Sequence, residues 1–310
     1  RLKQIRPTEA LNHFKAAARR QPEEPGIHLG MANSHQLLGD IASAEACLEK
    51  ELLLSPDSAQ AAVNLGWILE EQNRVPEALM QYRKALYYNL NHADLRWNHG
   101  LACLMLGDYA RGWRDYEFRW KARKKQKPTF SKPEWKGDLL NGRSLLLHTE
   151  QGFGDSIMFL RFAQQIGRAN NRVSLQCQPQ LKSLFSAQPN LQHVVANGEK
   201  RPSHDLHAPL MSLPHLLGLT RENDFHSQAY LSPDELSIVP IPEAKPDHKK
   251  IAVVWTSAPH GETQEKRTVP YSKFSKLFNT PNCTFYSVQI NADATAIADM
   301  NQRSNVHDLR

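Results

Sequence analysis

The sequence predicts an α-solenoid of repeated helix pairs, followed by an α/β part with Rossmann-like parallel sheets. Two observations lead to this fold class. Small residues recur at intervals of 34 through the first third of the chain, at Ala10, Ala44, Ala78 and Gly112. After Arg143 the pattern changes to short apolar runs, each followed by a loop and a helical stretch. The chain has 310 residues, a length that suits about two domains.

The 34-residue interval holds in further columns of the sequence. Large side chains keep the same spacing, at Phe14, Leu48, Tyr82 and Tyr116. Gly39-Asp40 and Gly107-Asp108 stand where the turn between two helices belongs. A period of 34 with small residues at the helix contacts is typical of tetratricopeptide repeats. The alternative is an irregular helical domain that lines up by chance, which agreement over three to four units disfavours.

We therefore expect tetratricopeptide repeats over residues 1–120. Each unit is two antiparallel helices that bury their apolar faces only by stacking on neighbours. The first unit lacks its first helix, because Arg1 falls at its end, so we expect the chain to start inside a longer protein. The last unit departs from the pattern at Gly112 and Arg119, as a unit facing another structure would. We expect the repeats to bind a protein or peptide partner.

Composition narrows the class of protein. No apolar run reaches the roughly 18 residues that a membrane span needs, and the first 20 residues lack a secretory apolar core. The four cysteines are scattered, without the paired spacing of a zinc site or a disulfide framework. His204, Asp205 and His207 have metal-compatible chemistry, but strand alternation separates His204 from Asp205. We expect a cytoplasmic protein without a metal or cofactor.

Most of the positive charge lies in one segment. The chain carries a net charge of +6, and the stretch from Arg119 to Lys136 holds eight basic residues against the single acid Glu134. Such a stripe could bind nucleic acid or an anionic membrane surface. It lacks the interleaved aromatic residues of a single-strand binder. We interpret residues 121–142 as a solvated basic linker and expect no nucleic-acid partner.

Residues 143–233 alternate between strand and helix patterns and predict a first Rossmann-like domain. Helices are expected over 157–166 and 181–185, and strands over 144–148, 172–177, 191–196 and 204–208. Four prolines and several charges in the stretch from Pro233 to Lys249 mark a linker over 234–249. A second Rossmann-like domain begins in 250–310, with strands over 250–256 and 284–289 and a helix over 271–278. Ligands bind between two such halves, at the carboxyl ends of the strands.

The junction after the first strand carries the sharpest local signal. Gly152 and Gly154 let the backbone turn tightly and approach a ligand, and the amides that open the next helix favour an anion. Asp155 stands in the first helical turn, where its carboxylate could accept a proton from a sugar hydroxyl. The alternative is that Asp155 only caps the helix, a role worth about 1 kcal/mol.

Several motifs resemble a known family. Trp135 to Gly142, the run Leu145-Leu-Leu-His-Thr-Glu-Gln-Gly-Phe-Gly-Asp155, Phe159 to Phe162, Asp205 to Pro214 and Ile251 to Ser257 are similar to bacterial tetratricopeptide proteins fused to a glycosyltransferase. The catalytic part resembles glycosyltransferase family 9, the heptosyltransferase group. This resemblance implies a GT-B fold, an acceptor-side Rossmann half and a half for a nucleotide-sugar donor. It also implies inverting, metal-independent transfer.

The resemblance also implies roles for individual residues. Asp155 would be the catalytic base, and Glu150, Gln151, Gly152, Gly154 and Arg161 would bind the acceptor. Thr256, Ser257, Lys266 and Arg267 would bind the donor. For Lys266 and Arg267 a solvated charged loop is the alternative, since Glu262 and Glu265 stand beside them.

The sequence departs from this family in its last part. The family completes its donor site with a later Asp-containing motif and a following histidine, which do not occur before Arg310. We expect an incomplete second Rossmann half of two strands and little or no transferase activity in these 310 residues. The rival hypothesis is a non-catalytic scaffold, in which the repeats bind a partner and the α/β part is a degenerate remnant.

Overall fold

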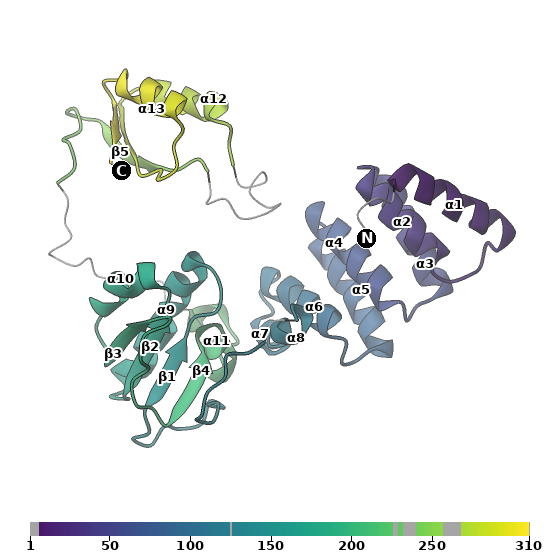
Figure 1. Cartoon of the computed structure of the whole chain (residues 1–310), viewed down its shortest axis with the longest axis horizontal. Coiled ribbons are helices and arrows are strands. Elements are labelled where there is room, and N and C mark those ends of the chain that lie inside the picture. Colours follow the sequence, from purple (N-terminus) through teal and green to yellow (C-terminus); the bar gives the residue numbers. More distant parts are fainter. Residues whose placement is uncertain (1–5, 125, 226–228, 232–239, 257–267, 310) are drawn as a thin grey trace. The chain divides into compact units, whose positions relative to one another are not determined.

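The chain folds into two compact units, Arg1–Pro233 and Asp234–Arg310. The first contains a helical solenoid and a four-stranded sheet, and the second contains a three-stranded sheet (Figure 1). The computed structural model describes residues 6–124, 126–225, 229–231, 240–256 and 268–309.

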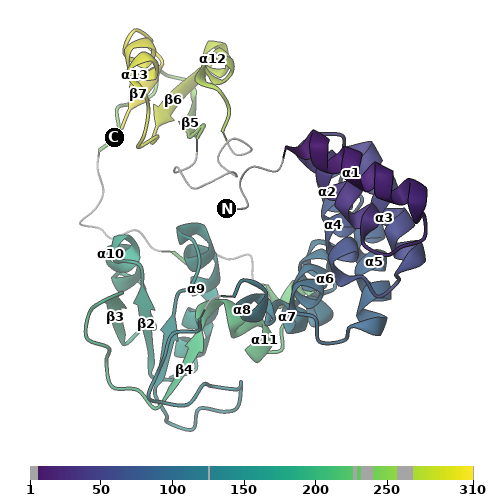
Figure 2. The same cartoon turned by 45° about the vertical axis from the view of Figure 1, so that its right-hand side comes forward.

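Antiparallel helices stacked in sequence make up the solenoid (Figure 2). The helices are α1 (Pro7–Arg20), α2 (Ile27–Leu37), α3 (Ile41–Leu54), α4 (Ala59–Glu71), α5 (Val75–Tyr88), α6 (Ala93–Met105), α7 (Tyr109–Tyr116) and α8 (Arg119–Ala122). The pairs α2/α3, α4/α5 and α6/α7 each span one 34-residue unit. Helix α1 carries Ala10, so it is equivalent to the second helix of the later pairs.

The residues that keep the 34-residue interval are those that pack the helices together. Ala44 and Ala78 are fully buried, and Tyr82 is buried with them. Gly39 and Gly107 adopt φ angles of +77° and +78° at the turns, a conformation that glycine takes without a steric cost. The helical repeat predicted from the period is confirmed.

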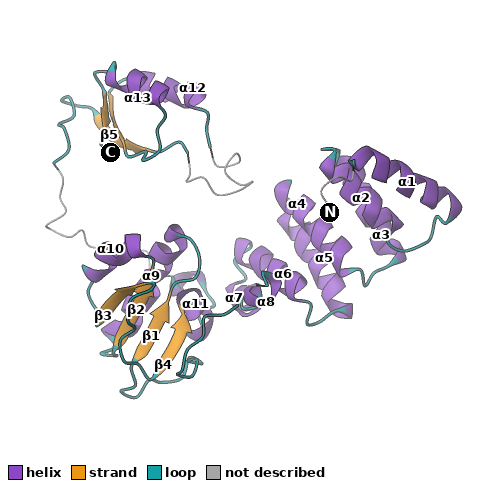
Figure 3. Cartoon of the chain, viewed as in Figure 1, coloured by secondary structure: helices purple, strands orange, loops and turns teal. Residues whose placement is uncertain are grey.

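The first sheet contains four parallel strands in the order β3-β2-β1-β4 (Figure 3). Its strands are β1 (Leu145–His148), β2 (Val173–Cys177), β3 (His193–Ala196) and β4 (Leu206–Pro209), and its helices are α9 (Phe153–Arg168), α10 (Lys182–Ser186) and α11 (Leu213–Leu216). Leu145 and Leu147 of β1 pack with Phe159 and Leu160 of α9 in one core. Helix α9 begins four residues before the predicted helix.

The end of the solenoid shares this core. Trp97 and Leu101 of α6 and Trp113 of α7 pack against it, and Trp135 is a buried member of it. The Trp135 amide donates to the carbonyl of His207 in β4, so the segment after the repeats runs along the edge of the sheet. Within residues 121–142, Trp135 and Leu140 are thus buried in this core.

The second unit contains three parallel strands in the order β5-β6-β7. Its elements are β5 (Lys249–Val253), α12 (Tyr271–Phe274), a 3₁₀ turn (Ser275–Asn279), β6 (Cys283–Ser287), α13 (Ala294–Asn301) and β7 (Val306–Asp308). The expectation of two strands is wrong, because β7 pairs with β6 through Phe285 and Val306. Among the described residues, no helix combines the length and the apolar character needed to cross a membrane.

Candidate functional site at the junction of β1 and α9

Asp155 stands in the first turn of α9, just beyond the carboxyl end of β1. Its Oδ2 atom accepts a hydrogen bond of 3.0 Å from the amide of Gly152, the residue before the helix. A carboxylate in this position also lies close to the positive end of the helix dipole. Asp155 is partly exposed to solvent. The side chain therefore caps the helix and still meets solvent, so capping and a chemical role are compatible.

The two glycines of the junction are exposed, and neither has a backbone that requires glycine. Gly152 has φ −70° and ψ 172°, which any residue adopts, and Gly154 is not among the glycines with positive φ. The tight-turn explanation is therefore wrong for both. A β-carbon built on Gly154 would meet no atom within 4 Å among the described residues. Gly154 thus faces open space, whereas a β-carbon on Gly152 would lie 3.3 Å from Oδ2 of Asp155.

Glu150 is buried and joins the sheet to the end of the solenoid. Its Oε1 atom accepts hydrogen bonds of 2.9 and 2.6 Å from Arg119, which also contacts Glu117 at 2.7 Å and Ser212 at 2.9 Å. Burial raises the pKa of Glu150, against the opposing effect of Arg119. Oε2 of Glu150 is buried without a hydrogen-bond partner among the described residues. The geometry gives Glu150 an anchoring role in the fold.

Gln151 connects the junction with the last repeat and with β2. Its side-chain amide donates to the Tyr116 hydroxyl at 2.8 Å. Its backbone carbonyl accepts a hydrogen bond of 2.7 Å from the side-chain amide of Gln178, just after β2. Trp120 and Arg123 line a small cavity with Gln151, Glu150 and Arg119. The solenoid therefore contributes side chains next to the junction. The departure of the last unit from the repeat pattern, at Gly112 and Arg119, is the sequence signal that fits this contact.

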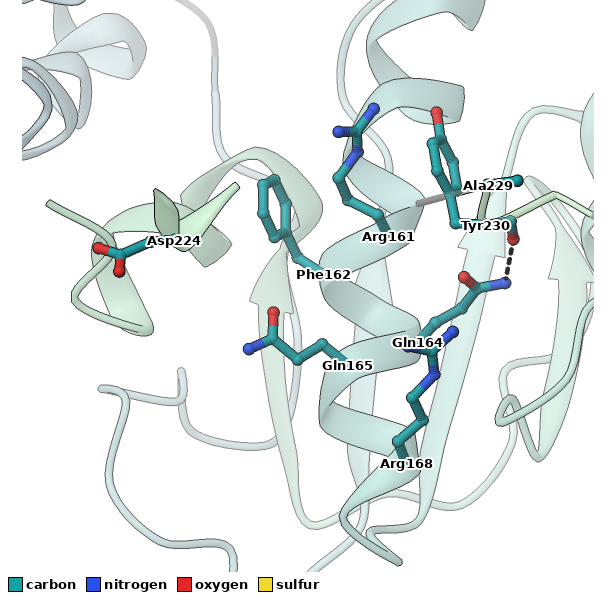
Figure 4. Close-up of a pocket in the computed structure, with 8 residues that line it drawn as sticks. All are labelled: Arg161, Phe162, Gln164, Gln165, Arg168, Asp224, Ala229 and Tyr230. Carbon is teal, nitrogen blue, oxygen red and sulfur yellow. Dashed lines mark hydrogen bonds between the residues drawn. The ribbon is translucent and has the colours of Figure 1, made fainter. Parts of the chain in front are cut away.

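Arg161 lies further along α9 and borders a different cavity. Its guanidinium carbon is 4.4 Å from the centre of the Tyr230 ring (Figure 4). The cavity has a volume of about 80 Å³ and is lined by Arg161, Phe162, Gln164, Gln165, Arg168, Asp224, Ala229 and Tyr230. Arg161 stands six positions after Asp155 on the helix, a displacement of about 9 Å along the axis and about 120° around it. The structure does not bring these two predicted site residues together.

Of the predicted donor-binding residues, Thr256 is described. It follows β5, and its amide donates to Oε1 of Gln289 at 3.0 Å while its hydroxyl contacts that of Thr268 at 2.9 Å. Thr256 is thus held at the carboxyl end of a parallel strand, where α/β folds bind ligands. Ser257, Lys266 and Arg267 lie outside the described residues.

A second candidate surface runs across the first helices of the repeats. The Asn64 side chain of α4 donates to Asn33 of α2 at 2.8 Å, and Gln60 donates to Asn64 at 2.8 Å. Trp67, one turn further along α4, is 45% exposed. Its equivalent in the next unit, Leu101, packs instead against the α/β core. We call the hydrogen-bonded side chains of Asn33, Asn64 and Gln60 the polar ladder. Together with Trp67 they form a surface on the earlier repeats, while the last unit is covered by the sheet domain.

Known proteins resemble both parts of the chain. A sequence profile of the tetratricopeptide repeat matches residues 29–87. Protein FlbA of Caulobacter vibrioides is 24% identical over 311 residues, which cover 92% of this chain and 52% of that protein. The chain thus spans about half the length of this curated relative, and the match extends through the repeats into the α/β part.

Solved structures of repeat proteins are similar to the solenoid. MamA is 20% identical, with a TM-score of 0.34, over 38% of this chain and 64% of its own. YrrB, described as a tetratricopeptide protein with an unusual peptide-binding site, is 20% identical, with a TM-score of 0.34, over 37% of this chain and 59% of its own. From the profile match and the stacked helix pairs, the N-terminal part of the chain is a solenoid of tetratricopeptide repeats.

Proposed function

We propose that this chain is part of an inverting, metal-independent glycosyltransferase of the GT-B type, whose repeats bind a protein acceptor or partner. The observation that carries the proposal is the carboxylate of Asp155. It stands at the carboxyl end of a parallel strand, partly exposed, beside the open space at Gly154. The resemblance of residues 150–155 to family 9 glycosyltransferases supports the same reading.

The proposed reaction needs one proton acceptor on the acceptor side. A hydroxyl of the acceptor, bound beside Gly152 and Gly154, gives its proton to Asp155 as its oxygen attacks the anomeric carbon of a nucleotide-activated sugar. The new carbon–oxygen bond forms on the face opposite the diphosphate, and the bond to the diphosphate breaks with inversion. Oδ2 of Asp155 is held by the Gly152 amide at 3.0 Å, so Oδ1 is the atom that we expect to take the proton.

The donor would bind to the second unit. Thr256 at the end of β5, with Ser257, Lys266 and Arg267 after it, would hold the diphosphate and stabilise the charge that develops on the leaving group. The donor is a nucleotide-diphosphate sugar by this reasoning.

The end of the solenoid supports a protein as the acceptor. The Tyr116 hydroxyl accepts a hydrogen bond from the side-chain amide of Gln151. Trp120 and Arg123 border a cavity beside Gln151, at the junction of β1 and α9. A polypeptide bound along the repeats would thereby reach a site where its serine or threonine hydroxyl could meet Asp155. The peptide-binding capacity of tetratricopeptide repeats fits this arrangement.

Two variants of the full-length protein test the proposal. Asp155→Asn keeps an oxygen that can cap α9 but removes the base, and we expect transfer from a panel of nucleotide-diphosphate sugars to fall by two orders of magnitude or more. Gly154→Ala places a methyl group in the open space without a clash, and we expect it to weaken acceptor binding. Gln165→Ala, at an exposed position further along α9, is the matched control. Undiminished transfer by Asp155→Asn would remove this residue as the base.

A non-catalytic scaffold is the second candidate, favoured by the polar ladder of Asn33, Asn64 and Gln60 next to Trp67. Binding of nucleotide sugars separates the two. A ligand at 100 times its dissociation constant adds about 2.7 kcal/mol to the free energy of unfolding, which thermal melting detects readily. If no nucleotide-diphosphate sugar stabilises the full-length protein, the scaffold is the better description.

A further inference from the structure

A cavity of about 330 Å³ opens between α3 and α5, the second helices of two neighbouring repeats. Its floor includes the buried residues Leu65 and Ala85, and its rim is more polar. The lining residues are Glu49, Leu52, Leu53, Pro56, Leu65, Gln81, Lys84 and Ala85. The cavity lies apart from the polar ladder and from the β1–α9 junction.

The 34-residue period relates this cavity to equivalent positions in the neighbouring units. The tetratricopeptide motif places tryptophan three residues before its Leu-Gly pair. In the unit with Leu65-Gly66 that position is Ala62, which is fully buried. The equivalent residues in the neighbouring units are His28 and Arg96. Ala62 is therefore the smallest of the three side chains.

The contacts of His28 and Arg96 show what the equivalent space accommodates in the neighbouring units. Nε2 of His28 lies 3.2 Å from the carbonyl oxygen of Pro22, and Nε of Arg96 donates to the carbonyl oxygen of Leu90 at 2.6 Å. Pro22 and Leu90 are 34 residues before and after Pro56, which lines the cavity. A nitrogen donor facing this carbonyl thus occurs in both flanking units.

Arg96 reaches two further positions that correspond to the cavity wall. Its guanidinium contacts Asp115 at 3.2 Å and lies 5.7 Å from the centre of the Phe118 ring. Asp115 and Phe118 stand 34 residues after Gln81 and Lys84, both of which line the cavity. Arg96 therefore occupies in its own unit the space that corresponds to the cavity.

We propose that the cavity between α3 and α5 receives an arginine side chain from a protein partner. The carboxylate of Glu49 and the carbonyl of Pro56 offer acceptors to the guanidinium, and Gln81 stands at the position that Asp115 occupies beside Arg96. Leu52 and Leu65 supply apolar surface for the methylene stem, which arginine buries readily. Lys84 is exposed, so its ammonium can turn to solvent. This inference is independent of any transferase activity.

Methyl NMR of the full chain with blocked Gly-X-Gly peptides tests the proposal. We expect the Arg peptide to shift the methyl signals of Leu65 and Ala85 saturably, with a dissociation constant in the millimolar range. The Ala peptide and the neutral citrulline peptide should give no saturable shift. Glu49→Gln should weaken binding of the Arg peptide about fivefold, the size of one partly exposed ion pair.

Substitution of Ala62 by a larger residue provides a second test of the proposal. Ala62→Arg copies Arg96, and Ala62→His copies His28, so at least one should keep the fold. We expect either variant to abolish the response to the Arg peptide and to raise the melting temperature. Equal shifts from the Ala peptide would overturn the proposal, as would an unchanged response in a folded Ala62 variant. Preference for a Trp peptide over the Arg peptide would also overturn it, by showing a different occupant.

Discussion

Gly66 on α4 and Tyr82 on α5 pack so closely that a β-carbon built on Gly66 would lie 2.2 Å from Cε1 of the Tyr82 ring. The preceding unit has Ala32 and Leu48 at the equivalent positions, both buried in the same core. Alanine on the first helix is thus paired with leucine on the second, and glycine on the first helix is paired with the larger tyrosine. The size of the side chain on the second helix decides whether alanine or glycine fits on the first.

The first prediction concerns this pair. Gly66→Ala should lower the free energy of unfolding by about 1–3 kcal/mol, because the added methyl overpacks the contact with the ring. In a Tyr82→Leu background, which copies Leu48, the same change should cost little or be favourable. Urea unfolding of the four proteins in the cycle measures the coupling. Equal costs of Gly66→Ala in both backgrounds would contradict the explanation.

A second prediction compares two glycines of α9. A β-carbon on Gly154 would meet nothing within 4 Å, whereas one on Gly167 would lie 2.0 Å from the carbonyl oxygen of Asn190. Gly154→Ala should keep the free energy of unfolding within about 1 kcal/mol or raise it, because alanine favours a helix. Gly167→Ala should lower it by 1 to 3 kcal/mol, a magnitude usual for overpacking. Paired urea titrations decide, and the reverse order would refute the packing described here.

The third prediction tests the buried anchor between solenoid and sheet. Arg119→Met leaves the carboxylates of Glu117 and Glu150 without their shared cation and should lower the free energy of unfolding by about 3–5 kcal/mol. Lys182→Met breaks the exposed pair with Glu199 and should cost less than about 1 kcal/mol. Both values come from urea unfolding. A loss at Arg119 no larger than at Lys182 would show that the cluster adds nothing to stability.

The solenoid could be predicted from the sequence because its contacts recur at a fixed interval. The first strand of the sheet was predicted as well, since Leu145, Leu146 and Leu147 are all buried. Strand β7 was missed. It has three residues and gains its stability from pairing with β6, so no local pattern marks it.

The candidate site was predicted in part. Asp155 falls in the first turn of α9, as its place after a strand and two glycines indicates. The contact of Gln151 with Tyr116 joins residues 35 positions apart, and no periodicity relates them. Arg119 was noted as one charge of the basic stretch and as a departure from the repeat pattern. It is 2% exposed, because two carboxylates and a hydroxyl gather around it only in the folded chain.

The face of the sheet that carries His148 provides a test by pH. His148 of β1 is buried, and neither ring nitrogen has a hydrogen-bond partner among the described residues. Phe130 stacks on His148 and His207 with ring centres 4.7 and 4.0 Å apart. Burial lowers the pKa of His148 to about 3, with His207 and Arg201 adding to the effect, and burial also lowers the pKa of His207.

The fourth prediction follows from the sign of these shifts. Between pH 6.5 and about 3, His148 binds a proton in the unfolded chain but not in the folded chain. The free energy of unfolding therefore falls as the pH drops, by up to about 1.4 kcal/mol per pH unit.

His148→Phe keeps a ring against Phe130 and removes the titrating group. Urea unfolding between pH 7.5 and 4.5 should show a shallower decline in this variant, whereas His193→Gln on the exposed part of β3 should follow the parent protein. Parallel declines for His148→Phe and the parent would mean that a proton does reach His148 in the folded chain, and that the stack on Phe130 opens to admit it.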